Sequence, residues 1–350
     1  SIKMNNKNSF NHNNWLKNSD KLGLNILNSR GISIYLDKKG YINYRLSRNE
    51  PYISTKDYKS LENIFLNITG EGTDLSAFKD KNKSSNEYYL GEKLKIIPED
   101  LKLVTEEIFD PFSKEEFILQ DNYTYKLNNF KPSVYMLLDY ELKKELKFHL
   151  ENSAIGKLIL HLVNYDRQRL YWVINWLAYF FQGLKKSQVA LVLLGEQGAG
   201  KGIFFNEVIK PLFGEDFVKT INDKSLNTNY KGSLVENTLF FNLDEISAKN
   251  SSSSSIKNFL KALVTNESIT AEKKFKNLEK ETPIYGQILI TSNELYALEI
   301  EPSDRRFTVF STSGNLSHYS FLGYGSYEAL SNAIKSELES FAIYLKNYYV

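Results

Sequence analysis

Residues 189–202 read Val-Ala-Leu-Val-Leu-Leu-Gly-Glu-Gln-Gly-Ala-Gly-Lys-Gly. The apolar first half has the character of a buried strand, a glycine-rich turn follows it, and residues 203–213 are amphipathic like a helix. This order, with the pattern G-x-x-x-x-G-K, predicts a loop that binds phosphate groups, because glycines let backbone N–H groups turn inward and a helix N-terminus carries partial positive charge. We therefore expect a nucleotide to be bound by Gly195, Glu196, Gln197, Gly198, Ala199, Gly200, Lys201, Gly202 and Ile203.

At the end of this loop, one residue fits the phosphate-binding pattern and the next one differs from it. Lys201 is the expected mobile cation for the β- and γ-phosphates. Gly202 stands where Ser or Thr usually offers a hydroxyl to magnesium, and Ile203 cannot replace that hydroxyl. Because Mg²⁺ keeps several of its waters, a water can take this place. A glycine-rich turn without a ligand is the alternative, and the flanking strand and helix argue against it.

A second apolar run ends in two carboxylates. Residues 239–245 read Leu-Phe-Phe-Asn-Leu-Asp-Glu, which suits a central strand that delivers Asp244 and Glu245 at its C-terminal end. Open α/β sheets place their ligands at that end. We expect Asp244 to hold Mg²⁺, directly or through water, and Glu245 to orient or polarise the attacking water.

Two further polar positions flank strand-like runs. Asn293 ends the run 287–292, where its amide could contact both the γ-phosphate and the water. Arg305 and Arg306 precede the run 307–311, and a guanidinium suits the charge that develops on a transferring phosphoryl group. Paired arginines are more often ordinary salt-bridge partners. Their position after Asn293 favours an arginine finger that acts on a neighbouring subunit's nucleotide.

Lysines gather around one aromatic residue between Asp244 and Asn293. A hairpin there could offer Lys273, Lys274 and Lys276 to phosphates and Phe275 to a base. On composition alone a solvated charged turn is the better interpretation, because several glutamates dilute the charge.

The bulk composition excludes several classes of protein. Hydrophobic residues make up 42% of the 350 residues and charged ones 25%, as in ordinary globular proteins. A net charge of +2 means that any basic surface is local, and the lack of cysteine excludes disulfides and thiolate metal sites. No stretch has the character of a signal peptide or membrane span. We therefore expect a cytoplasmic protein with no membrane partner.

The pattern along the chain predicts an α/β fold with a mostly parallel sheet in the C-terminal half, where strand-like and helical runs alternate. The expected strands are 189–194, 217–221, 238–243, 286–292 and 307–311. The expected segments are a linker or poorly ordered start (1–30), a small α+β domain (31–130), a helical segment (131–185), the core (186–315) and a C-terminal helical segment (316–350).

Local patterns make further predictions before the core. Hairpins are expected over 32–46 and 116–127, and a helix from Pro98 to about residue 109. The aromatic stretch 167–181 could stack bases, but its periodicity favours a helix packed inside the protein.

The loop, the acidic pair, Asn293 and the arginine pair, in this order and spacing, resemble a superfamily 3 helicase. More narrowly, the chain resembles the helicase part of phage and plasmid primase-helicases and primase-polymerases, the D5-like group. The resemblance covers about residues 120–312 and includes Tyr-Lys-Leu-Asn-Asn-Phe-Lys-Pro at 125–132 and the aromatic segment 172–177. This subgroup often carries glycine after the lysine, as at Gly202.

The resemblance implies an AAA+-like P-loop ATPase that uses ATP and Mg²⁺ and forms a homo-oligomer, a hexameric ring with nucleotide between subunits. It implies that the arginine at 305 or 306 reaches across to the neighbour, and that the lysine segment at 273–276 is a pore hairpin that grips single-stranded or forked DNA. No primase or polymerase site is evident before residue 120, so any such domain would lie upstream in a longer protein. The expected function is that of an ATP-dependent DNA helicase in phage or plasmid replication, in the cytoplasm of the bacterial host.

Two alternatives remain open. The chain could be another P-loop ATPase, such as a replication initiator or a packaging motor. It could also bind nucleotide only as a structural clamp on DNA, because Gly202 lacks a hydroxyl.

Overall fold

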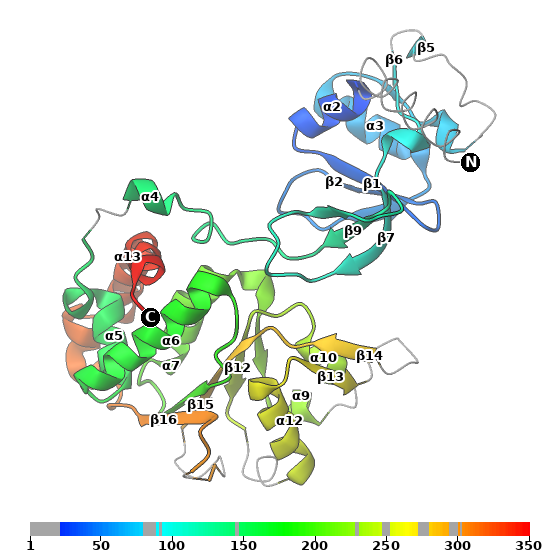
Figure 1. The fold of residues 1–350 in the computed structure, drawn as a ribbon. Helices are drawn as coiled ribbons and strands as arrows, with labels where there is room; N and C mark the ends of the chain where they lie inside the picture. Colours follow the sequence, from blue (N-terminus) through cyan, green and yellow to red (C-terminus); the bar gives the residue numbers. More distant parts are fainter. Residues whose placement is uncertain are drawn as a thin grey trace. The chain divides into compact units, whose positions relative to one another are not determined.

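The computed structural model describes residues 22–79, 89–90, 93–143, 147–227, 231–246, 253–271, 280–293, 300–301 and 303–350. These residues form two compact units. The first unit comprises two segments, the chain up to Ile108 and Glu115–Asn128. The second unit comprises Phe109–Lys114 and Asn129–Val350. Figure 1 shows the elements of both units. Each unit has its own hydrophobic clusters.

The first unit is built on a six-stranded mixed sheet with the order β3-β2-β1-β7-β9-β8. Leu61 and Phe65 of helix α3 are buried in the hydrophobic cluster against this sheet. The strands are β1 (Ser33–Asp37), β2 (Ile42–Arg45), β3 (Ile53–Thr55), β7 (Leu103–Ile108), β8 (Phe117–Leu119) and β9 (Tyr125–Asn128), and the helices are α2 (Leu22–Ser29) and α3 (Tyr58–Thr69). A smaller sheet joins β4 (Thr73–Asp74), β6 (Lys93–Lys95) and β5 (Tyr89–Leu90). Both hairpin predictions are confirmed, since β1 pairs with β2 and β8 with β9 in antiparallel fashion.

Two predictions for this unit are wrong. The helix expected from Pro98 is a single turn, η3 (Pro98–Asp100), whose start is capped by the Asp100 carboxylate as it accepts from the Ile97 N–H at 3.0 Å. The following residues form β7, because parallel pairing with β1 and β9 uses their backbone groups and buries Val104. The poorly ordered start expected over 1–30 is also wrong in part, because residues 22–29 form α2 and Leu27 is fully buried. Residues 1–21 lie outside the described chain.

The second unit contains a five-stranded, wholly parallel sheet with the order β11-β12-β15-β10-β16. Its strands are β10 (Ala190–Leu194), β11 (Val218–Ile221), β12 (Phe240–Asp244), β15 (Gln287–Ser292) and β16 (Phe307–Ser311). All five expected strands are confirmed within one or two residues at each end. The first strand, β10, lies inside the sheet between β15 and β16, so the strand order reverses beside it.

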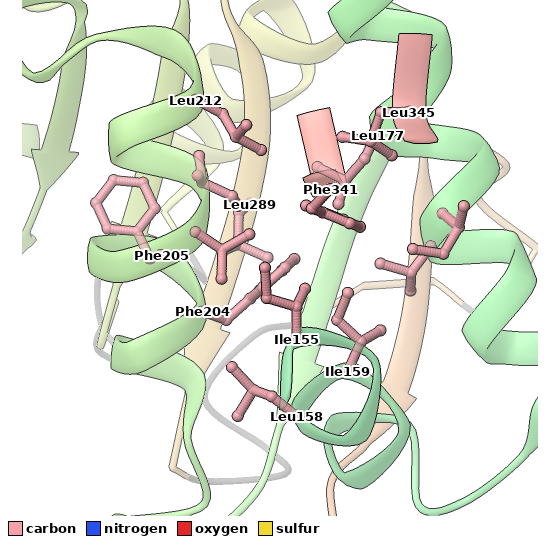
Figure 2. Packing of buried hydrophobic residues seen from close by; sticks show 14 of the residues in the cluster. Ile155, Leu158, Ile159, Leu177, Phe204, Phe205, Leu212, Leu289, Phe341 and Leu345 are labelled. Atoms are coloured by element: carbon pink, nitrogen blue, oxygen red, sulfur yellow. The ribbon is translucent and has the colours of Figure 1, made fainter. Parts of the chain in front are cut away.

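Both faces of this sheet are covered, which explains why its strands are continuous apolar runs. Along β10, Leu191 and Leu193 belong to one hydrophobic cluster, whereas Val192 and Leu194 belong to the other. Figure 1 shows α5 (Ala154–Leu162), α6 (Arg167–Gly183) and α13 (Tyr327–Asn347) on the first side and α12 (Ser254–Thr265) on the second. Figure 2 shows residues of this cluster from three helices, with Phe341 of α13 above Ile155 of α5, and Leu345 of α13 beside Leu177 of α6.

The aromatic stretch 167–181 is the buried helix α6. Trp176 is only 4% exposed, its indole N–H donates to the Val189 carbonyl at 2.8 Å, and its ring lies edge-on to Phe240 at 5.6 Å. Trp172 is half-buried beside it and stacks on Trp176. The packed-helix interpretation is therefore confirmed for this segment.

The helix that follows the glycine loop changes its winding along its length. It starts as α7 (Lys201–Ile203), continues as the π-type stretch η5 (Phe204–Ile209) and ends as α8 (Lys210–Phe213). Pro211 accounts for the wider turn, because it has no N–H to donate and its ring excludes the carbonyl of the residue four positions earlier.

Shorter elements complete the unit, and they connect the longer ones. They are α4 (Tyr140–Lys143), η4 (Leu150–Asn152), η6 (Glu215–Phe217), α9 (Asp223–Leu226), α10 (Lys231–Val235), η7 (Leu316–Gly323) and an antiparallel pair, β13 (Ser268–Ala271) with β14 (Lys280–Pro283). Within the described residues, no helix is both long and apolar enough to span a membrane.

Replacing Phe240 by Ala should lower the free energy of unfolding of this unit by about 3–5 kcal/mol, because Phe240 is fully buried among Trp176, Phe180 and Phe213. Urea unfolding followed by tryptophan fluorescence measures the change. Phe112→Ala is the matched control, since Phe112 is 60% exposed, and it should change the free energy by less than about 1 kcal/mol. Equal effects of the two substitutions would contradict this packing.

Candidate functional site

A cavity of about 580 Å³ opens at the carboxyl edge of the parallel sheet. Its walls come from the glycine loop after β10, the ends of β12 and β15, and the segment that follows β16. The strand register explains why these segments meet, since Leu194 pairs with Ser292, and Asp244 pairs with Thr291. The cavity therefore lies where the strand order reverses, which is where open α/β sheets bind ligands.

The glycine loop depends on glycine at three positions. Gly198 and Gly200 have φ of 84° and 106°, values that side-chain-bearing residues rarely adopt. A Cβ at Gly195 would lie 1.7 Å from Thr312 Oγ1, and one at Gly200 would lie 2.8 Å from Leu158. Gly202 is different, because it lies in the helix and a Cβ there would meet nothing closer than Asn206 at 3.9 Å. The space around residue 202 therefore does not require glycine there, unlike the space at Gly195 and Gly200.

The Lys201 side chain bends back over the loop. It is 7% exposed, and its ammonium group donates to the carbonyl oxygens of Gly195 and, at 3.0 Å, of Glu196. Burial lowers the pKa of Lys201, and the nearby carboxylates of Glu245, Asp244 and Glu196 oppose that shift. A buried cation near carboxylates that line the same cavity is suited to binding a polyanion together with a metal ion.

The acidic pair lies at the end of β12, as expected. The Asp244 carboxylate accepts from the Thr291 hydroxyl at 2.8 Å, and the Glu245 carboxylate accepts from the Asn293 backbone N–H at 2.7 Å. Glu245 has φ of 51°, an uncommon left-handed conformation for a residue with a side chain, and such strain often occurs at functional sites. Asp244, Glu245 and Asn293 all line the cavity together with residues 197–203.

The donor groups at this edge fit magnesium by their chemistry. Asp244 and Glu245 supply carboxylate oxygens, and Thr291 and Asn242 supply a hydroxyl and an amide oxygen beside them. In the described part of the chain, no group of three or more His, Asp or Glu residues could hold a metal. Mg²⁺ needs only one or two carboxylates, because waters and substrate phosphates complete its shell.

The structure does not bring the arginine pair into this cavity. Arg305 and Arg306 precede β16, and Phe307 pairs with Ala190 at the start of β10. They therefore lie at the opposite edge of the sheet from the glycine loop, about 13 Å of strand away at roughly 3.3 Å per residue. Arg306 forms an ion pair with Asp304 at 3.4 Å, whereas Arg305 is exposed and forms no ion pair with another described residue. A contact with nucleotide would need another subunit.

The predicted DNA-binding residues Lys273, Lys274, Phe275 and Lys276 lie outside the described residues. The strands on either side, β13 and β14, pair in antiparallel fashion from Ser268 with Pro283 to Ala271 with Lys280. The hairpin that the prediction requires is thus present at its base.

Sequence reasoning missed the segment after β16, which closes the cavity. The Asn315 backbone N–H donates to the Glu196 carboxylate at 2.5 Å, and the Leu316 N–H donates to the Gly198 carbonyl at 2.9 Å. Asn315, Leu316, Phe321 and Tyr327 line the cavity, as do Phe205, Asn206 and Thr220. Glu196 and Gly195, predicted to bind nucleotide, do not line it, although Glu196 holds this segment against the loop.

His161, on α5, supports the same segment from behind. It is fully buried, and its Nε2 lies 2.6 Å from the Gly314 carbonyl oxygen while its Nδ1 lies 2.8 Å from the Tyr165 hydroxyl. Burial lowers the pKa of His161. No local pattern signals this role, because a lone apolar-flanked histidine usually belongs to the core.

A family model and a curated relative match parts of this chain. A model for a family of unknown function, DUF5906, matches residues 193–306. The DNA primase-polymerase of Nitratiruptor phage NrS-1 is 34% identical over 221 residues, which cover 63% of this chain and 29% of that protein. The chain therefore spans less than a third of that curated relative.

Solved structures of the NrS-1 C-terminal region have the same fold. One matches with a TM-score of 0.68 and 26% identity, covering 95% of this chain and 70% of that one. A second, described as the A form, matches with a TM-score of 0.64, 25% identity and the same coverage. The chain is thus similar to a phage primase-polymerase and shares the mixed α/β fold of its C-terminal region.

The two glycines at the end of the loop should respond oppositely to alanine. Gly202→Ala should raise the free energy of unfolding by about 0.5–1 kcal/mol, because alanine favours a helix and nothing blocks its Cβ. Gly200→Ala should lower it by more than about 1 kcal/mol through its φ and its contact with Leu158. Urea denaturation measures both, and a stabilised Gly200→Ala variant would refute the loop conformation.

Proposed function

We propose that this chain is an AAA+-like P-loop ATPase of superfamily 3 type that drives a DNA helicase during phage or plasmid replication. One observation carries the proposal: Lys201, at the end of a glycine loop, lines a single cavity together with Asp244 and Glu245 at the point where the parallel sheet reverses its strand order. The similarity to a phage primase-polymerase supports a role in replication.

Different residues of the cavity bind the phosphates, hold the metal ion and orient the attacking water in this proposal. The N–H groups of the glycine loop and the Lys201 ammonium bind the phosphates, with the ammonium leaving the carbonyl oxygens of Gly195 and Glu196 to do so. Asp244 holds Mg²⁺, directly or through water, and the ion neutralises charge on the phosphate oxygens when bound. Glu245 exchanges its hydrogen bond from Asn293 for one from the attacking water.

The arginine pair acts between subunits in this proposal. Because Arg305 and Arg306 lie at the opposite edge of their own sheet, they cannot reach the nucleotide of the same chain. A ring of identical subunits has head-to-tail interfaces, which bring one edge of each subunit to a different edge of the next. Arg305 is the better candidate for the finger, since Arg306 is paired with Asp304.

Single-stranded DNA is the proposed partner, bound by Lys273, Lys274, Phe275 and Lys276, which lie between β13 and β14 in the sequence. A subunit shift on hydrolysis would move these residues along the DNA strand. ATPase activity that DNA stimulates without strand separation would favour an initiator or packaging motor. Nucleotide binding without phosphate release would favour a clamp. Steady-state ATPase assays with and without single-stranded DNA, followed by strand displacement on forked DNA, separate the three.

Lys201→Ala should lower the ATPase rate at least about 100-fold, because the only cation in the described wall of the cavity is removed. The fold should persist, as checked by circular dichroism. Lys210→Ala is the matched control on the same helix, outside the cavity, and should hydrolyse ATP normally. Hydrolysis by Lys201→Ala at the wild-type rate would end the proposal.

Mixing two inactive variants tests the intersubunit arginine. Arg305→Ala and Lys201→Ala should each hydrolyse ATP poorly alone. In an equimolar mixture, about a quarter of the interfaces of randomly assembled rings would join an intact loop to an intact arginine, and activity should return to about that fraction. Measured phosphate release that stays at the level of the separate variants would show that the arginine does not act across subunits.

A further inference from the structure

Three of the side chains that line the cavity have no role in binding phosphates. They are Leu316, Phe321 and Tyr327, which are large and come from the chain after β16. A cavity of about 580 Å³ has the size of a small-molecule site, whose walls are mostly apolar with a few polar groups. These three side chains therefore fit a ligand with an apolar, flat part.

The backbone that carries Phe321 is strained. Ser320, Phe321 and Leu322 have φ/ψ of 49°/39°, 48°/52° and 61°/29°, so three successive residues with side chains adopt the left-handed conformation. Such residues ordinarily occur singly, because Cβ approaches the following carbonyl oxygen. Strain of this kind persists where the surroundings enforce it, and it gathers at ligand-binding sites.

Contacts with the rest of the second unit hold this left-handed turn in place. The Gly325 N–H donates to the Ser320 carbonyl at 2.9 Å and closes the turn, and Leu322 and Phe321 pack against the hydrophobic cluster that contains Leu191 and Leu193. Four residues before the turn, the Leu316 N–H donates to the Gly198 carbonyl, and Leu316 is 1% exposed. The segment that carries the turn is therefore bonded to the glycine loop.

Tyr327 is an exposed residue that lines the same cavity. It is the first residue of α13, it is 52% exposed, and its hydroxyl lies 3.2 Å from a carboxylate oxygen of Glu207 on the helix that follows the glycine loop. Asn206, the exposed residue before Glu207, adds an amide to the wall. An exposed aromatic ring fixed by one hydrogen bond, beside a polar amide, is an arrangement suited to the face and the edge of a base.

We propose that Phe321 and Tyr327 bind the nucleobase of the nucleotide whose phosphates lie in the glycine loop. The inference rests on the proposed nucleotide site and adds the residues that distinguish a nucleotide from a bare polyphosphate. The base contacts the aromatic wall while Asn206 offers hydrogen bonds to its edge. The left-handed turn exists to place Phe321 at this position.

The test compares a ligand that has a base with one that lacks it, using isothermal titration calorimetry with Mg²⁺ present. ADP and inorganic pyrophosphate serve, since neither is hydrolysed as ATP would be. The wild-type chain should bind ADP more tightly than pyrophosphate. Tyr327→Ala should weaken ADP binding about tenfold, the scale of one base–aromatic contact, and leave pyrophosphate binding unchanged. Tyr327→Phe should restore ADP binding, because it keeps the ring.

Two controls separate the outcomes. Lys201→Ala should weaken both ligands, because it removes the cation from the glycine loop, and Tyr179→Ala, a 40% exposed tyrosine on α6 outside the cavity, should weaken neither. If Tyr327→Ala binds ADP as the wild type does, or if the wild type binds the two ligands equally, the nucleobase site is refuted and the phosphate site stands. If the wild type binds neither ligand, the proposed function fails as well.

Discussion

The interior position of β10 is the constraint on which the candidate site depends. Its carboxyl end is bonded from both sides, because the Gly195 N–H donates to the Ser292 carbonyl at 3.1 Å and the Thr312 N–H donates to the Leu194 carbonyl at 2.8 Å. Since both neighbours bind the strand up to its last residue, the chain must turn away sharply at Gly195. A turn in so little space needs the conformational freedom of glycine, and Gly198 and Gly200 supply it.

The same arrangement links the site to the core of the second unit. Ile155 of α5 packs on α13 (Figure 2), and His161 at the end of α5 holds the Gly314 carbonyl. Gly314 precedes the residues that bond to Glu196 and Gly198. The loop is thus supported from below by packed helices, so a substitution deep in this cluster can alter the cavity without touching it.

The sequence predicted the parallel sheet well for a physical reason. A strand buried on both faces has no polar side, so β10 and β15 read as continuous apolar runs, and their polar ends mark the edge where a ligand binds. The local sequence pattern gave a wrong prediction where strand pairing determined the backbone conformation. Pro98 and Asp100 do form a turn, but residues 103–108 extend because β1 and β9 take up their backbone groups. Nothing within that segment encodes those partners.

By itself, therefore, the sequence determined the strand–loop–helix unit with Lys201 at the start of its helix, and the placement of Asp244, Glu245 and Asn293 at strand ends. Each of these depends on a local pattern of apolar, glycine and charged residues. The tertiary structure alone decided which other residues share the cavity. Leu316, Phe321 and Tyr327 reach it through a left-handed turn, and Arg305 is kept from it by the direction of β16. Contacts of this kind arise from packing and strand register between segments that are distant in the sequence. Such contacts produce no periodic pattern of residues from which they could be predicted.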